Sequence, residues 1–467
     1  MVGPNYYPPC IEEQVWFEPE TDNVNDEPIV IDWWNTFQDP ILTALIEDVI
    51  RGNLSLKIAQ ERILEARALR GIAFAPLFPW IGANASYTTF QDSLNSPGGE
   101  PFFVAQGIAE RRNEVYDANF DAFWELDIFG GKRRALQAAN ARLGSSIASK
   151  RDVLLSAIAE TARNYFELRG FQKRLYLLNK NATLQENTLD LVKKKNAIGL
   201  AREVDVTRAK ALLENTRSQI PDLEADLQAT SYRISVLTGR DPLALNTFLK
   251  EERPLLIPED VIPIGLRSDV LRRRPDVQFA EREFAAATAD IGVAIAKLFP
   301  SFTLTGDYGF LSAGTLGNLF TPRSETWIFN GLIHFPIFEG GRLLANVHLQ
   351  QALQSQAGIE YCRTILLALE DAEGAIIRYS KERETRQRRQ EEVKAAKKSV
   401  QLLRSLYQKG LTDFLDVLLA EREQTSAEDN LAQSETRVLT QLVSLYKSLG
   451  GGWESFECSE INQNQTR

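Results

Sequence analysis

Few side chains in this 467-residue sequence could do catalytic or metal chemistry. Its two histidines, His334 and His348, are too few for a histidine-rich metal centre or a paired acid and base. Its cysteines, Cys10, Cys362 and Cys458, lie far apart and form no CxxC motif, which argues against a disulfide framework or a zinc site. No nucleophile–base pair or glycine-rich phosphate loop is present either. We therefore expect no enzyme activity, no cofactor and no bound metal.

Carboxylates are the reactive groups with a clear pattern. Asp117, Asp121 and Asp127 recur on one side of a segment in which polar and apolar residues alternate. The other side is apolar and aromatic: Tyr116, Phe120 and Trp124. A strand places alternate residues on opposite faces, so one face would meet water and the other a hydrophobic surrounding. The acids are then candidates for the wall of a water-filled lumen.

Four segments of this kind occur, near residues 81–87, 116–128, 302–308 and 327–337. Each is about ten residues long, the length of a tilted transmembrane β-strand. A half-buried sheet of a soluble domain is the alternative. Because membrane barrels start at about eight strands and an open edge in lipid is costly, four strands require several chains. Two, three or four chains would give 8, 12 or 16 strands.

The remaining sequence predicts long helices that position these strands. No proline lies between Pro101 and Pro221, or after Pro336, and both gaps are rich in good helix formers. A helix of ~68 residues would be about 100 Å long. Helices of that length must pack side by side as coiled coils.

Motifs that recur in the same order indicate an internal duplication. Leu77-Phe78-Pro79 returns as Leu298-Phe299-Pro300, and Ile128-Phe129-Gly130-Gly131 as Ile337-Phe338 followed by Gly340-Gly341. Gly199-Leu200 likewise returns as Gly410-Leu411. We predict an N-terminal segment at 1–40, repeats at 41–238 and 264–450, a proline-rich linker at 239–263 and a tail at 451–467.

These residues resemble the outer membrane efflux proteins of the TolC type, and most of all their drug-efflux lipoprotein branch. Three of the stretches that carry the resemblance are Val2-Gly3-Pro4-Asn5-Tyr6, Leu271-Arg272-Arg273-Arg274-Pro275-Asp276-Val277 and Tyr446-Lys447-Ser448-Leu449-Gly450-Gly451-Gly452-Trp453. The pattern of the first helix, from Trp33-Trp34 to Asn53-Leu54, is similar as well. The branch has a lipid-modified cysteine just before the first stretch, where this sequence has Met1. We expect a mature segment without signal and anchor, or a member without the anchor.

The resemblance implies a mainly α-helical fold with a β-barrel part. Long antiparallel helices would form an α-barrel across the periplasm, and three chains would share a 12-stranded barrel. It also implies a passive exit duct in the outer membrane of a Gram-negative bacterium, for drugs or other small molecules. A periplasmic adaptor and an inner-membrane efflux transporter are the implied partners, with outer membrane lipid around the barrel. A coiled-coil envelope scaffold without a pore is the alternative, and it has no use for the four strands. The net charge of −10 disfavours nucleic acid as a partner.

The resemblance also implies a constriction at the helix tips near Gly199 and Gly410. The residues of this constriction would be Asp416, Leu415, Tyr407, Asp205 and Arg422. Asp416 is the first acid of the family's Asp-Val-Leu-Asp pattern, which reads Asp416-Val417-Leu418-Leu419 in this chain. Three copies of Asp416 around one axis would favour cations over anions. A Tyr407–Asp205 hydrogen bond would hold the tips shut by a net ~1 kcal/mol. The alternative is ordinary structure, since the helix dipole favours an acid in the first turn and Leu415 and Arg422 fit coiled-coil packing.

Overall fold

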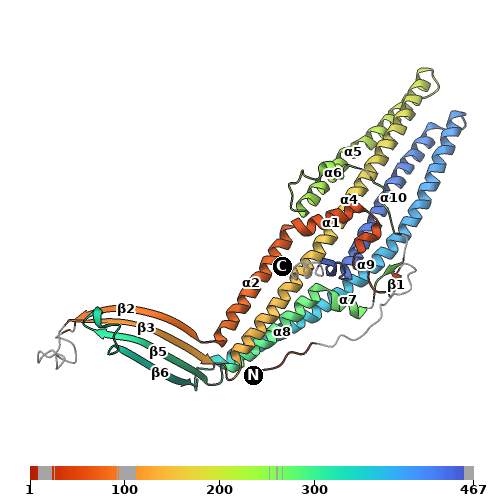
Figure 1. The fold of residues 1–467 in the computed structure, drawn as a ribbon. Helices are drawn as coiled ribbons and strands as arrows, with labels where there is room; N and C mark the ends of the chain where they lie inside the picture. The colour runs from red at the N-terminus through yellow and green to blue at the C-terminus, as the bar shows by residue number, and fades with distance from the viewer. Residues whose placement is uncertain are drawn as a thin grey trace. The chain divides into compact units, whose positions relative to one another are not determined.

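The computed structural model describes residues 1–8, 24–25, 27–91, 93, 112–251, 253–258, 261–265 and 267–456 (Figure 1). Cys10, Cys458 and nearly all of the residues between the first two alternating segments (92 and 94–111) lie outside this part. The chain divides into two compact units. One contains Met1–Pro8, Leu64–Ser145 and Glu281–Glu360, and the other contains Pro9–Ile63, Ser146–Ala280 and Tyr361–Arg467.

Helices make up most of the described chain. They are α1 (Pro40–Gly52), α2 (Leu54–Phe74), α4 (Gly131–Ala197), α5 (Glu203–Leu237), α6 (Asn246–Leu249), α7 (Arg267–Arg273), α8 (Pro275–Ala296), α9 (Arg342–Gln408) and α10 (Phe414–Ser448). Helices α4 and α9 are each 67 residues long, which confirms the two long helices expected in the proline gaps. Helix α5 continues through Pro221. Within the described residues, no helix is both long and apolar enough to span a bilayer.

The four alternating segments form one antiparallel sheet. Its strands are β2 (Trp80–Gln91), β3 (Arg112–Leu126), β5 (Ser301–Ala313) and β6 (Glu325–His334), in the order β2-β3-β5-β6. Each repeat therefore supplies one hairpin, and β3 and β5 join the two hairpins (Figure 1). Two short strands, β1 (Val24–Asn25) and β4 (Ile262–Pro263), pair in parallel elsewhere.

The register of the sheet gathers the apolar residues of all four strands on one face. Directly paired residues of an antiparallel sheet share a face. Phe120 pairs with Tyr308, which pairs with Trp327, whereas Asp121 pairs with Asp307 on the opposite face. Alternation therefore has the predicted phase in every strand. In the described part of the sheet, β2 and β6 are edges with one unpaired side each.

The largest hydrophobic core lies in the second unit, around Trp33, Phe37, Tyr165 and Tyr446. The rings of Trp33 and Tyr446 stack with centroids 5.2 Å apart, which attaches the segment before α1 to the end of α10.

Arg274, from the arginine motif, fastens a second junction of this unit. Its guanidinium donates to the carbonyl oxygens of Ser448 (2.9 Å) and Ala368 (3.3 Å) and forms an ion pair with Asp276. It is 8% exposed, so one buried side chain ties the start of α8 to α9 and to the end of α10.

Candidate functional site

The helix tips of the second unit are built from two tight turns. Gly199 follows α4 and Gly410 follows α9, with φ of 77° and 74°, a conformation that glycine adopts without strain. An apolar cluster packs the four helix ends together, and its members come from α4 (Leu189, Val192), α5 (Ala209, Leu213) and α10 (Phe414, Val417). The turns thus return each long helix antiparallel, and the cluster fixes the two hairpins against each other.

Asp205 and Tyr407 lie near each other at the tips, but the expected hydrogen bond between them is a wrong prediction. The buried Asp205 carboxylate accepts from the backbone N–H and the guanidinium of Arg202, at 3.3–3.4 Å, and so caps the start of α5. The negative charge of Asp205 nevertheless affects the Tyr407 hydroxyl. Burial first, and the Asp205 carboxylate second, raise the pKa of the Tyr407 hydroxyl.

The contact that joins the two tips comes from Lys195, a residue that the sequence did not single out. Its ammonium lies 3.9 Å from the centre of the Tyr407 ring and donates to the Tyr407 carbonyl oxygen at 3.4 Å. The Tyr407 ring also packs on Phe414, with centroids 5.5 Å apart. The sequence shows a lysine four residues before the tip glycine Gly199, which could have indicated a contact at the tip. Its partner Tyr407 could not be identified from the sequence, because it lies over 200 residues away along the chain.

The other expected constriction residues lie on one exposed stripe of α10. Asp416, Leu415 and Arg422 are all exposed in the single chain, whereas Val417 is buried in the tip cluster. The Asp416 carboxylate accepts a hydrogen bond from the Thr412 hydroxyl just before the helix. The structure thus brings Asp205 and Tyr407 together in the interior and leaves Asp416, Leu415 and Arg422 on the outside of the hairpin.

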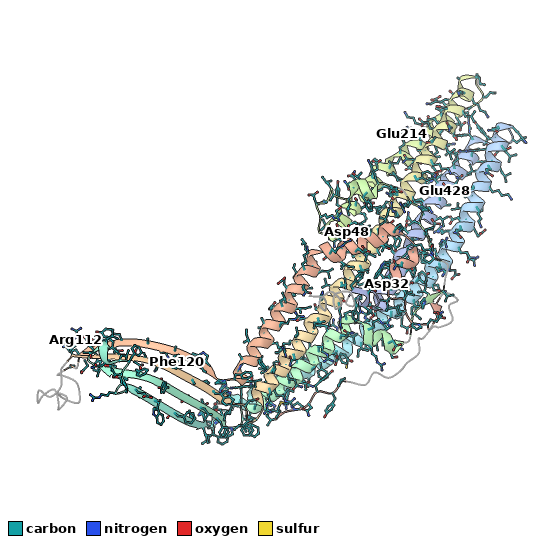
Figure 2. The ribbon with its side chains drawn as sticks, in the orientation of Figure 1. Asp32, Asp48, Arg112, Phe120, Glu214 and Glu428 are labelled. Carbon is teal, nitrogen blue, oxygen red and sulfur yellow. The ribbon has the colours of Figure 1, made fainter. Side chains whose placement is uncertain are left out.

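Three buried glutamates on α10 form a feature that the sequence reading missed. Glu421, Glu428 and Glu435 repeat every seven residues and are 4–9% exposed (Figure 2 labels Glu428). Their partners come from α9 and α4: Arg404 (2.7 Å) for Glu421, Lys397 (3.2 Å) for Glu428 and Lys173 for Glu435. A heptad spacing of acids was the signal for such a row. The middle of α10 is therefore joined to its neighbours by ion pairs, whereas its two ends pack in apolar clusters.

The polar face of the sheet in the first unit carries its own hydrogen-bonded acids. Asn84 donates to Asp121 at 2.6 Å, and Asn119 donates to Asp307 at 2.6 Å and to Asp117 at 3.5 Å. These amides separate like charges that would otherwise repel across the strands. Asp117 and Asp121 thus lie on the predicted face, opposite the side that carries Phe120.

Asp127 differs from the other two acids. Strand β3 ends at Leu126, and the Asp127 carboxylate accepts from the backbone N–H groups of Lys132 (2.9 Å) and Arg133 (3.0 Å). It caps the first turn of α4 and is not part of the strand face, which corrects its assignment to the barrel lumen.

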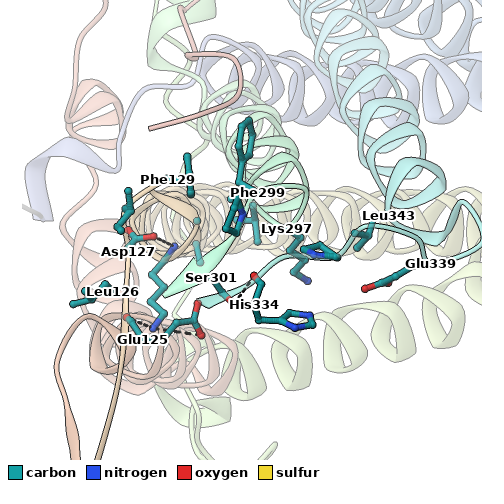
Figure 3. A pocket seen from close by; sticks show the side chains of 18 of the residues that line it. Glu125, Leu126, Asp127, Phe129, Lys297, Phe299, Ser301, His334, Glu339 and Leu343 are labelled. Carbon is teal, nitrogen blue, oxygen red and sulfur yellow. Dashed lines mark hydrogen bonds and ion pairs between the residues drawn. The ribbon is translucent and has the colours of Figure 1, made fainter. Parts of the chain in front are cut away.

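A cavity of about 380 Å³ lies where the strands meet the helices of the first unit (Figure 3). Its lining mixes three cations with three carboxylates: Lys132, Lys297, Arg342, Glu125, Asp127 and Glu339. The lining therefore carries equal numbers of lysine or arginine and carboxylate side chains. Among the described residues, no group of histidine, cysteine and acidic side chains could hold a metal ion.

Comparison with known proteins identifies what this arrangement resembles. The family model described as "Outer membrane efflux protein" matches residues 45–240 and 266–451. The curated relatives include "Nodulation protein T" of Rhizobium leguminosarum bv. trifolii, 31% identical over 97% of this chain and 94% of that protein. They also include the "Pyoverdine export outer membrane protein OpmQ" of Pseudomonas putida, 31% identical over 91% of this chain and 88% of that protein.

A solved structure gives the same result in three dimensions. The outer-membrane channel OprN superposes with a TM-score of 0.90 at 34% identity, over 97% of this chain and 99% of the other.

Proposed function

The chain belongs to the outer membrane efflux protein family, and from this we propose that three copies of it enclose one passive exit duct. Like its family, the protein is an outer membrane channel of an efflux pump, and it extends into the periplasm of a Gram-negative cell. The family consists of transport channels, not of enzymes. The duct would release drugs or other small molecules to the exterior without transforming them.

One observation carries this proposal: the sheet has one apolar face, one polar face and two unpaired edges. An apolar face suits lipid and a polar face suits a water-filled lumen. Edges cannot remain open in a bilayer, because each unpaired backbone group there costs several kcal/mol. Further copies of the chain would supply the missing strands, and the family resemblance favours three chains and twelve strands. A scaffold without a pore would not need such a sheet.

The partners follow from the same resemblance. A periplasmic adaptor would join the duct to an inner-membrane efflux transporter, which supplies the energy that a passive duct lacks. One relative is named for pyoverdine export and another for nodulation, so the names of the relatives do not point to one cargo. We propose that the pump chooses the cargo of this chain.

The helix tips are the proposed gate. Three copies of the α10 stripe with Leu415, Asp416 and Arg422 would meet at the axis, with Leu415 narrowing the passage and Asp416 giving it negative charge. The contact of Lys195 with Tyr407 would hold each hairpin pair in the closed arrangement, and Asp205 would fix the start of α5 beside it.

Two measurements test the duct. Purified protein added to a planar lipid bilayer should give discrete ion conductance, and the chain expressed in a cell that lacks its own efflux channel should restore export. Protein that inserts in the bilayer without conducting would contradict the proposal. A channel that conducts but restores no export would support the proposed duct and contradict the proposed partnership with an efflux pump.

A further inference from the structure

The second unit contains the same joint between helices twice. In the first joint, the end of α5 meets the start of α2. The Asn53 side chain donates to the Leu237 carbonyl oxygen at 2.9 Å, and its own oxygen accepts from the backbone N–H of Ser55 at 2.9 Å. All of these groups are neutral, so a joint of this kind forms without an ionised side chain.

The second joint, between the end of α10 and the start of α8, has charged groups at the same positions. Counted from the repeated Leu-Phe-Pro motifs, Arg274 stands where the first repeat has Asn53, and Asp276 stands where it has Ser55. The Arg274 guanidinium donates to the Ser448 carbonyl oxygen at 2.9 Å, which is the counterpart of the Asn53 contact. The charges are therefore an addition to a joint that the fold also makes without them.

Arg274 has no N–H group to spare for a further partner. A guanidinium carries five N–H donors. Nε and Nη2 donate to the Asp276 carboxylate at 3.0 and 2.6 Å, and Nη2 also donates to Asp371 at 3.3 Å. Nη1 donates to the carbonyl oxygens of Ser448 (2.9 Å) and Ala368 (3.3 Å). Two carboxylates and two carbonyl groups thus use all five donors.

A third carboxylate, that of Asp152 in α4, lies at this joint without a donor. It lines a cavity of about 220 Å³. The charged side chains of the lining come from α4, the start of α8, α9 and α10: Asp152, Arg274, Asp276, Asp371, Arg378 and Lys447. Asp152 is partly buried, and within the described residues its carboxylate has no hydrogen bond and no ion pair. Burial first, and the negative charge of Asp276 second, raise the pKa of Asp152.

We propose that Asp152 is a pH-sensitive group of the joint between α8 and α10, which loosens the joint when it is ionised and tightens it when it is protonated. The ionised carboxylate is withdrawn from water, is repelled by Asp276 and finds Arg274 already saturated. Protonation removes that charge and leaves the other contacts of Arg274 intact. The cavity is built by helices of one chain, so the inference goes beyond the proposed duct and does not depend on how copies assemble.

The sign of the pH dependence follows from linkage. The pKa of Asp152 is higher in the folded chain than in the unfolded chain, so protonation favours the folded state. The stability gained in this way is fully present below the unfolded pKa of about 3.9 and is lost as the pH rises through the folded pKa. Asp152 should therefore weaken the fold at neutral and higher pH and should cost nothing at acidic pH.

Thermal unfolding in detergent, monitored by circular dichroism, tests the proposal. Asp152→Asn keeps the shape of the side chain and removes its charge. The melting temperature of the variant should exceed that of wild type by roughly 2–4 °C at about pH 8, and the difference should vanish near pH ~4. Asp190→Asn, which changes an exposed acid of the same helix, is the matched control and should give no such pH-dependent difference. A difference between Asp152→Asn and wild type that is the same at every pH would overturn the proposal.

Lys447→Met gives a second measurement that leaves Asp152 in place. The Lys447 ammonium opposes the rise in the pKa of Asp152, so its removal makes the ionised carboxylate less stable. At low salt, where an exposed charge is little screened, Lys447→Met should lower the melting temperature more at about pH 8 than at about pH 4. This extra loss should disappear when Lys447→Met is combined with Asp152→Asn. An equal effect of Lys447→Met with and without the Asp152 carboxylate would show that Asp152 is not the titrating group of the joint.

Discussion

Asp416 shows how a residue can be exposed in the single chain and still belong to a site. Its carboxylate is hydrogen-bonded only locally in the described structure, to Thr412, and it contributes nothing to the buried tip cluster. Such an acid adds little to folding, since exposed charges far from buried features change stability by at most about 0.5 kcal/mol. Its value would lie in the charge that three copies present together.

The change Asp416→Ala should lower the preference of the channel for cations by roughly fivefold, since two charges a few ångströms apart in water interact by about 1 kcal/mol. The measurement is the reversal potential in planar bilayers under a salt gradient. Asp222→Ala, which removes an exposed acid of α5 away from the tip, is the control. An unchanged reversal potential in Asp416→Ala would assign this residue to helix capping.

Tyr407 can hold the tips through its ring or through its hydroxyl, and the structure favours the ring. Lys195→Met should raise the conductance of the resting channel, because it removes a cation–π contact of about 0.5–2 kcal/mol. Tyr407→Phe should leave conductance nearly unchanged, because the ring stays. Single-channel currents of both variants beside wild type decide: a rise in Tyr407→Phe without one in Lys195→Met would make the hydroxyl the latch.

At the scale of elements, periodicity explains which predictions hold. The faces of all four strands follow from alternation, and the two 67-residue helices follow from the absence of proline. Asp127 was misplaced because the alternation of Leu126, Asp127 and Ile128 continues in the sequence after the backbone has left the strand. Arg202 and Lys195 were missed because side-chain partners depend on how helices pack, which the periodicity of a single helix does not contain.

The register of β3 gives a prediction in intact membranes. A water-soluble thiol reagent should label Asp121→Cys, whose side chain faces the polar side, and should fail to label Phe120→Cys on the apolar side. Both variants are made in a background without native cysteines, and labelling in detergent-denatured protein is the control for reactivity. Labelling at 120 with protection at 121 would reverse the two faces.

Arg274 gives a prediction about how helices are joined. Arg274→Ala should destabilise the fold by about 3 kcal/mol, because it leaves the Ser448 and Ala368 carbonyls and Asp276 without their buried partner. Arg274→Lys should recover little, since an ammonium lacks the planar fork. The loss of stability is measured by thermal unfolding in detergent, monitored by circular dichroism. The exposed Arg272→Ala is the matched control, and equal effects of the two alanine changes would contradict the assigned role.

At the scale of the whole molecule, the separation of apolar and polar faces decides how the protein can be handled. Aromatic residues such as Phe120, Trp327 and Phe329 are 62–72% exposed on the apolar face of the sheet. An apolar surface of this kind is not stable in water.

We therefore predict that the purified protein needs detergent and has the mass of a trimer in it. Detergent-corrected light scattering measures the protein mass, and analytical centrifugation after detergent removal measures solubility. A soluble monomer after detergent removal would rule out the membrane sheet, and a dimer or tetramer in detergent would change the number of strands.

The two unpaired edges of the sheet also constrain the kinetics of biogenesis. A lone chain in the bilayer would leave the outer sides of β2 and β6 without hydrogen-bond partners, so an inserted monomer is too high in free energy to accumulate. On the proposed assembly of three chains, insertion would follow, or coincide with, their meeting. The rate of channel formation should rise more steeply than linearly with the concentration of free chain, and any factor that keeps chains apart in the periplasm should delay insertion before it affects folding of the helices.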